Sequence, residues 1–279
     1  MTQIHWFPGH MKKALNNISE KIKLVDVVIE ILDARAPLSS MNPDLEKTIN
    51  NKKRLAVLSK SDLADPEQTK LWSLKLKEEF DSFLIINLND PKSSKVLSQE
   101  VAKLGEEKHK KEIAKGMKPQ PIKAMIIGIP NVGKSSLINL LANRRAAGVQ
   151  NKPGYTRGEQ FIKVNNDFIL LDTPGVLPMN YDDKQRATNI ALLGSIREDI
   201  LPNDVLVKSL LYILRGYYPD SLKERYDISE IKDDKNVLES VAIRRGLKKG
   251  NELDIEKAEI ILLKDFKDGR LGRITLDRI

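Results

Sequence analysis

The chain has 279 residues, of which 41% are hydrophobic and 31% are charged, a composition typical of one large or two ordinary globular domains. It has no cysteine, which excludes disulfides and thiolate metal sites. It shows no signal-peptide core and no apolar run near the roughly 18 residues of a membrane span, so we expect a cytoplasmic protein without a membrane partner.

The net charge of +8 is unevenly distributed along the chain. Residues 180–279 are neutral in sum, so residues 1–179 carry all of it. A cationic surface favours polyanions such as nucleic acid, although an ordinary solvated surface would need the same kinds of residue. If the protein binds nucleic acid, its N-terminal part must therefore contact it too.

Residues 1–178 alternate between strand-like and helix-like segments. Residues 65–80 begin with Asp-Pro and residues 135–142 follow a glycine-rich loop, and both segments predict helices. Residues 105–121 are polar and basic and predict a linker or a frayed helix. The alternation predicts an α/β fold with a mostly parallel sheet and helices on both faces. Apolar, β-branched runs predict the strands at residues 25–32, 55–58, 83–87, 122–127, 161–164 and 167–171.

Beyond residue 178 no segment predicts a strand. Asp233 and Asp254 stand where an N-cap stabilises the start of a helix. We therefore predict two domains, an α/β domain at residues 1–178 and a small all-helical domain at residues 179–279. Helical periodicity predicts the helices at residues 184–196, 204–216, 233–245 and 254–266.

The strongest motif is a phosphate-binding loop. Residues 128–135 read GIPNVGKS, which matches G-x-x-x-x-G-K-S, and they lie between a predicted strand and a predicted helix. The alternative is a structural glycine turn. The amides of such a loop suit a polyphosphate, Lys134 would reach its β- and γ-phosphates, and the Ser135 hydroxyl would bind Mg²⁺. The nucleotide-binding residues predicted here are Asn131, Val132, Gly133, Lys134, Ser135 and Ser136.

Two further motifs complete the predicted phosphate site. Residues 172–175 read DTPG and end a strand, where Asp172 can hold Mg²⁺ through water and the Gly175 amide can bind the γ-phosphate. Thr156 lies between the two motifs, at the spacing of a switch threonine whose hydroxyl binds Mg²⁺, although a loop threonine usually has no such role. Lys134 and Thr156 are thus candidate catalytic residues.

Residues 59–62, which read SKSD, resemble the guanine motif N-K-x-D. The Asp62 carboxylate can accept from N1–H and the 2-amino group of guanine, while the stem of Lys60 lies over the base. Ser59 replaces the usual asparagine, and an ordinary surface turn is the alternative. The loop at Asn87 and Leu88 is predicted to back the base. In most GTPases the phosphate loop precedes the guanine motif, whereas here it follows, so the motif order is circularly permuted.

With these motifs in this order, the chain resembles the circularly permuted P-loop GTPases, most closely the ribosome biogenesis GTPase A family. The resemblance implies a factor in late maturation of the 50S ribosomal subunit, which hydrolyses GTP to GDP and phosphate when bound to that particle. It also implies an RNA-contacting helical domain. The likeness covers nearly the whole chain and includes WFPGHM at 6–11, DARAP at 33–37, GIPNVGKSSLIN at 128–139, PGYTR at 153–157, DTPGVLPM at 172–179, RRG at 244–246 and LLKDFKDGRLGRITLD at 262–277.

The residue that activates water is not evident from the phosphate motifs. Many GTPases have glutamine directly after D-x-x-G, but here Val176 stands there and cannot orient a water. His10 has a side chain suited to proton transfer near neutral pH, and the resemblance implies that it is catalytic. The alternative is that it only docks the N-terminus. The resemblance also implies that Asn131 helps to bind K⁺.

Two other functions remain open at the level of sequence. One is a GTP-dependent signalling switch that binds a protein effector and no RNA. The other is an RNA-binding module with a degenerate nucleotide site, against which the intact Lys134, Ser135, Thr156 and Asp172 argue. We expect the protein to be a monomer.

Overall fold

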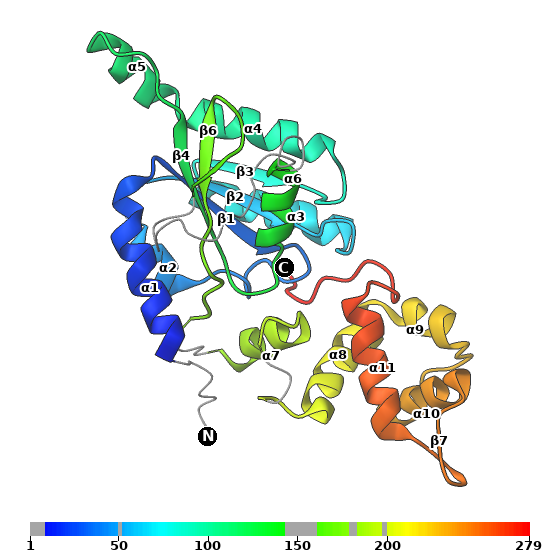
Figure 1. Cartoon of the computed structure of the whole chain (residues 1–279). Coiled ribbons are helices and arrows are strands. Elements are labelled where there is room, and N and C mark those ends of the chain that lie inside the picture. Colours follow the sequence, from blue (N-terminus) through cyan, green and yellow to red (C-terminus); the bar gives the residue numbers. More distant parts are fainter. Residues whose placement is uncertain (1–8, 50–51, 143–160, 179–182, 197–199) are drawn as a thin grey trace.

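The computed structural model describes residues 9–49, 52–142, 161–178, 183–196 and 200–279, with the backbone alone at residues 9, 10 and 142 (Figure 1). Its centre is a six-stranded sheet with the order β3-β2-β1-β4-β6-β5. All neighbouring strands are parallel except β5, which pairs antiparallel with β6. The strands are β1 (Val27–Asp33), β2 (Lys53–Ser59), β3 (Ser82–Ile85), β4 (Ile122–Ile127), β5 (Phe161–Lys163) and β6 (Phe168–Leu171).

The sheet is buried on both faces, as its continuous apolar strands predict. Alternate residues of β1 join different clusters, with Ile29 facing one layer of helices and Val28 the other. The helices of this part are α1 (Gly9–Lys21), α2 (Pro43–Thr48), α3 (Pro66–Leu76), α4 (Lys92–Leu104), α5 (Glu106–Ala114) and α6 (Lys134–Ala142). The predicted α/β fold with a mostly parallel sheet is therefore confirmed.

The segment predicted as a linker or frayed helix forms α5. This helix extends away from the sheet, and none of its side chains is buried (Figure 1). Its charged sequence offers no apolar face to bury, so it is held by local contacts instead. Among them, Lys108 Nζ donates to the carbonyls of Gln120 and Pro121 at 3.2 and 3.1 Å.

The C-terminal part is helical, as predicted, apart from one short hairpin. Gly246 ends α10 in the left-handed conformation, and strands β7 and β8 pair around the turn at Gly250. The helix α9 was not predicted because its sequence is polar and starts directly after a neighbouring helix. The elements are α7 (Lys184–Leu192), α8 (Asn203–Tyr217), α9 (Pro219–Tyr226), α10 (Asp234–Arg245), β7 (Lys248–Lys249), β8 (Glu252–Leu253) and α11 (Ile255–Lys267).

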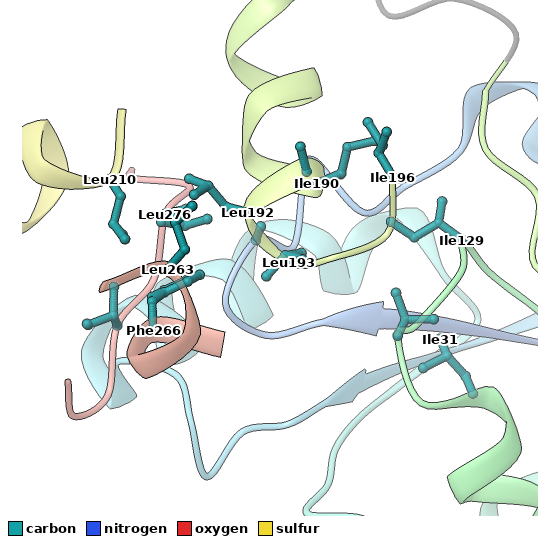
Figure 2. Packing of buried hydrophobic residues seen from close by; sticks show 14 of the residues in the cluster. Ile31, Ile129, Ile190, Leu192, Leu193, Ile196, Leu210, Leu263, Phe266 and Leu276 are labelled. Carbon is teal, nitrogen blue, oxygen red and sulfur yellow. The ribbon is translucent and has the colours of Figure 1, made fainter. Parts of the chain in front are cut away.

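The largest apolar cluster runs through both parts of the chain. Figure 2 shows Ile31 and Ile129 of the α/β part close to Ile196, and the cluster continues to Phe266 of α11. After α11 the chain returns to the sheet, where it ends (Figure 1). The buried Asp277 carboxylate holds this end, accepting from the Ser39 amide at 2.7 Å and the Ser39 hydroxyl at 2.6 Å. The helical part thus packs directly against the loop that follows β4, through Ile129.

None of the helices in the described ranges is long and apolar enough to cross a lipid bilayer.

Candidate nucleotide site

The loop between β4 and α6 has the geometry of a phosphate-binding loop. It follows a buried parallel strand and leads into a helix N-terminus, where free amides favour an anion. The side chain of Lys134 is buried, and its ammonium donates to the carbonyls of Gly128 at 3.2 Å and Ile129 at 2.8 Å. Burial lowers the pKa of Lys134 to about 8, against the opposing effect of the nearby Asp172 carboxylate.

A cavity of about 710 Å³ opens over this loop, a size that suits a nucleotide. It brings together three motifs that are far apart in the sequence, since its lining includes Lys60, Asn131, Lys134, Ser135, Asp172 and Gly175. Ser136 also lines it. Of the guanine motif, Lys60 lines this cavity, whereas Ser59 and Asp62 are not among its lining residues.

The DTPG segment packs closely against the phosphate loop. A Cβ atom on Gly175 would lie 2.8 Å from both Lys134 Nζ and Pro130 Cα, so no other residue fits there without displacing the lysine. Asp172 lies near this lysine and is exposed as a residue. Its carboxyl is nevertheless partly desolvated, which raises its pKa. The hard oxygens of Asp172 and Ser135 in one cavity fit Mg²⁺, which takes few protein ligands and completes its shell with phosphates and water.

Val176 is fully buried and takes no part in the cavity. Its amide donates to Gly128 O at 3.2 Å, its carbonyl accepts from Asn42 Nδ2 at 2.8 Å, and its side chain packs in the cluster beneath α1. The position after D-x-x-G therefore serves to anchor the segment and cannot orient a water.

The guanine motif is tied to the phosphate loop by its first two residues. The Ser59 hydroxyl lies 2.6 Å from Val132 O and 3.0 Å from Leu32 O, and its single proton favours the shorter contact. Lys60 Nζ donates to Asn131 O at 2.7 Å. A hydroxyl at residue 59 thus still links the two motifs. Asp62 is half-buried, and no hydrogen bond or ion pair to its carboxylate occurs within the described ranges.

Lys60 is also bound by Asp33, to which the motif analysis assigned no role. Asp33 Oδ2 lies 2.9 Å from Lys60 Nζ and 2.9 Å from Arg35 Nη2, and Asp33 Oδ1 accepts from Arg35 Nε at 3.0 Å. Burial raises the pKa of Asp33, but the charges and hydrogen bonds of Arg35 and Lys60 outweigh it and hold the pKa well below its usual range. The sequence shows only that an acid follows an apolar, strand-like run. The sheet order then places this strand beside the one that carries the guanine motif.

The predicted backing loop packs against the phosphate loop, although neither Asn87 nor Leu88 is among the residues that line the cavity. A Cβ atom on Gly133 would lie 2.6 Å from Leu88 Cδ1, so the leucine packs against the phosphate loop. Asn87 directs its side-chain oxygen to the Asn89 amide at 2.8 Å and stabilises the turn that presents Leu88.

Asn131 connects the phosphate loop to the helical part. Its backbone is left-handed, with φ of 62°, and its Nδ2 donates to the carbonyl of Gly194 beyond α7. Its side-chain oxygen accepts no hydrogen bond in the described part of the chain. Two predicted site residues are not placed: Thr156 lies outside the described residues, and so does the side chain of His10.

Comparisons with known proteins agree with this geometry. Residues 123–240 match the family model described as "50S ribosome-binding GTPase". The chain is 42% identical over 277 residues to ribosome biogenesis GTPase A of Bacillus cereus, covering 98% of this chain and 93% of that protein. It is 41% identical over 278 residues to the same protein of Priestia megaterium, covering 98% and 96%.

Among solved structures, the chain resembles GNP-bound YlqF from T. maritima. The two share 25% sequence identity and a TM-score of 0.67, over 95% of this chain and 98% of that one. The GDP-bound structure of YlqF matches with the same TM-score. The identities to ribosome biogenesis GTPase A of Bacillus cereus and Priestia megaterium extend over nearly the full length of each protein, which is sufficient to assign the family. The chain therefore belongs to the ribosome biogenesis GTPase A family of GTP-hydrolysing enzymes.

Proposed function

We propose that this GTPase is an assembly factor for the 50S ribosomal subunit, acts late in its maturation, and hydrolyses GTP to GDP and phosphate while bound to the particle. The observation that carries the proposal is the single cavity shared by Lys60, Lys134 and Asp172, in a chain whose relatives are named for ribosome biogenesis. The matching family model is itself described as ribosome-binding. The basic charge of residues 1–179 supports a contact with rRNA phosphates.

In this proposal the two parts of the chain have different functions. Residues 1–178 hold and hydrolyse GTP, and residues 179–279 contact RNA or ribosomal protein. In the RRGLKKG segment at residues 244–250, Arg245 is already engaged, because its Nη2 donates to the buried Asp265 at 2.8 Å. Lys248 and Lys249 are exposed on the hairpin β7–β8, and the ion pair of Lys249 with Glu256 at 3.6 Å lies in solvent, so both are better placed for phosphate contacts.

The nucleotide is held by residues with separate roles. The amides of Asn131, Val132 and Gly133 cradle its phosphates, Lys134 neutralises the β- and γ-phosphates, and the Gly175 amide donates to the γ-phosphate. Asp62 reads the base, Lys60 covers one face of it, and Leu88 backs it. Ser135, Thr156 and Asp172 would hold Mg²⁺, which supplies positive charge to the reacting phosphate.

His10 is the group that we propose orients or deprotonates the attacking water. Val176 is excluded from this role by its burial. The helix α1 starts at Gly9, and Met11 and Ala14 on its next turn pack in the same cluster as Val176. The first described side chains of α1 therefore pack in the same apolar cluster as the residue that follows DTPG, which supports a role for His10 at the site.

The proposal predicts that GTP hydrolysis in K⁺ buffer rises strongly on addition of 50S particles and not of 30S particles. His10→Ala should remove about a hundredfold of the stimulated rate, the usual contribution of a general acid or base, and leave GDP binding intact. His109→Ala is the matched control, because that histidine lies on the exposed helix α5. A rate unchanged by any particle would instead favour the signalling switch.

We also propose that Asn131 helps to bind a K⁺ ion through its side-chain oxygen. Turnover of the wild type should then be several-fold faster in K⁺ than in Na⁺ at equal ionic strength, and Asn131→Ser should lose most of this difference. Asn139→Ala, an exposed change on α6, should keep it. Equal wild-type rates in the two salts would contradict the proposal.

The pKa of Lys134 predicts how GDP affinity depends on pH. Phosphates stabilise the protonated amine, so binding takes up a proton wherever the free amine is neutral. Because the pKa of Lys134 is about 8, the dissociation constant should rise about tenfold between pH 7 and 9. Titration with a fluorescent GDP analogue at each pH measures this dissociation constant. The Lys134→Arg variant, whose side chain stays charged, should show no such rise. A flat wild-type profile would be inconsistent with the role of Lys134.

A further inference from the structure

The guanine loop, residues 60–65, is held from outside by the segment that follows α11. Arg273 Nη2 donates to Ser61 O at 2.8 Å, and Arg273 Nε donates to Ala64 O at 3.1 Å. The planar guanidinium presents its donors in a fixed, flat arrangement, so it sets the relative orientation of the two carbonyls, whereas the ammonium of a lysine is a freely rotating point donor. Asp62 lies between these two carbonyls in the chain.

Two further hydrogen bonds join the segment after α11 to the guanine loop. The Ile274 amide donates to Leu63 O at 3.0 Å, and the Asp65 amide donates to the hydroxyl of Thr275 at 3.1 Å. Ile274 and Thr275 are both buried, so the segment is firmly placed where it meets the loop. Four hydrogen bonds thus join residues 273–275 to the guanine loop.

The conformation of the loop requires such support. Lys60 adopts a left-handed backbone with φ of 55°, which is strained for an L-residue and persists only where surrounding contacts enforce it. The contacts with Asp33 and Asn131 fix the side chain of Lys60 at the start of the loop. The segment after α11 fixes the remainder of the loop, including both neighbours of Asp62.

A second link runs from the end of α11 to the same loop. Arg35 Nη1 donates to Lys267 O at 3.3 Å, and the guanidinium lies 5.6 Å from the centre of the Phe266 ring. The buried cation of Arg35 also interacts electrostatically with Asp62. Movement of α11 would therefore disturb Arg35, which shares the Asp33 carboxylate with Lys60 at the start of the loop.

We propose that Arg273 is a positioning residue for guanine recognition, which holds Ser61 and Ala64 so that Asp62 presents both carboxylate oxygens to the base. This rests on the proposed role of Asp62. Discrimination for guanine then depends on the C-terminal segment, although that segment does not line the nucleotide cavity. Because coupling between sites is reciprocal, a partner that displaces α11 weakens guanine binding, and bound guanine nucleotide holds α11 in place.

The test compares GDP with inosine diphosphate, whose base keeps N1–H but lacks the 2-amino group. A well-placed Asp62 binds both donors of guanine, so the ratio of the two affinities reports its alignment. Arg273→Ala should lower the GDP-to-IDP affinity ratio about tenfold, the worth of one hydrogen bond to a charged group. Arg273→Lys, which keeps the charge and the donors but not their fixed planar arrangement, should restore part of it.

Arg270→Ala is the matched control, since Arg270 lies in the same segment but pairs with Asp265 and Asp268 instead of the loop. It should leave the ratio unchanged, and thermal unfolding should confirm that every variant is folded. An unchanged ratio in folded Arg273→Ala, or an equal loss of GDP and IDP affinity, would overturn the inference. A wild type without preference for GDP over IDP would instead show that the role assigned to Asp62 is wrong.

Discussion

The carboxylate of Asp33 lies at the end of the central strand β1, where it is wholly buried and binds two cations. Through Lys60 it holds the guanine motif, and through Arg35 it reaches the last turn of α11. A buried carboxylate is stable in its charged form only with such partners, so the three residues depend on one another. Loss of Lys60 or Arg35 would leave the buried carboxylate with one cation instead of two, and loss of Asp33 would leave the buried guanidinium of Arg35 without its anion.

The nucleotide cavity therefore lies where three parts of the chain meet. The phosphate loop contacts the helical part through Asn131 and Gly194, and Ile129 behind it belongs to the apolar cluster shared with α7 and α11. The guanine loop contacts the segment after α11. The C-terminal part therefore contacts both loops of the predicted nucleotide site directly.

Sequence alone predicted the elements whose signals are local. The strand at 122–127 was placed with its bounds correct, because an apolar run ended at a glycine-rich loop, and the helix starting after Asp65 has the predicted cap. The contacts that shape the guanine loop were not predictable. Asp33 and Lys60 are 27 residues apart, and Ser61 and Arg273 are 212 apart, and only the sheet order and the return of the C-terminal segment bring them together. The contact of the Ser59 hydroxyl with Val132 O was likewise not evident from the replacement of the usual asparagine.

The most direct measurement is GDP affinity in Asp33→Asn, a change that keeps the size of the side chain and removes its charge. With Lys60 held only by the Asn131 carbonyl and the buried Arg35 left without its anion, we predict a protein that is less stable but folded. It should bind GDP about tenfold more weakly, as expected for loss of a charge-assisted hydrogen bond. The comparison is with wild type at the same pH and salt, with thermal unfolding as the check on folding. An affinity equal to that of wild type in a folded Asp33→Asn protein would contradict the account, because Lys60 would then hold its place without the buried carboxylate.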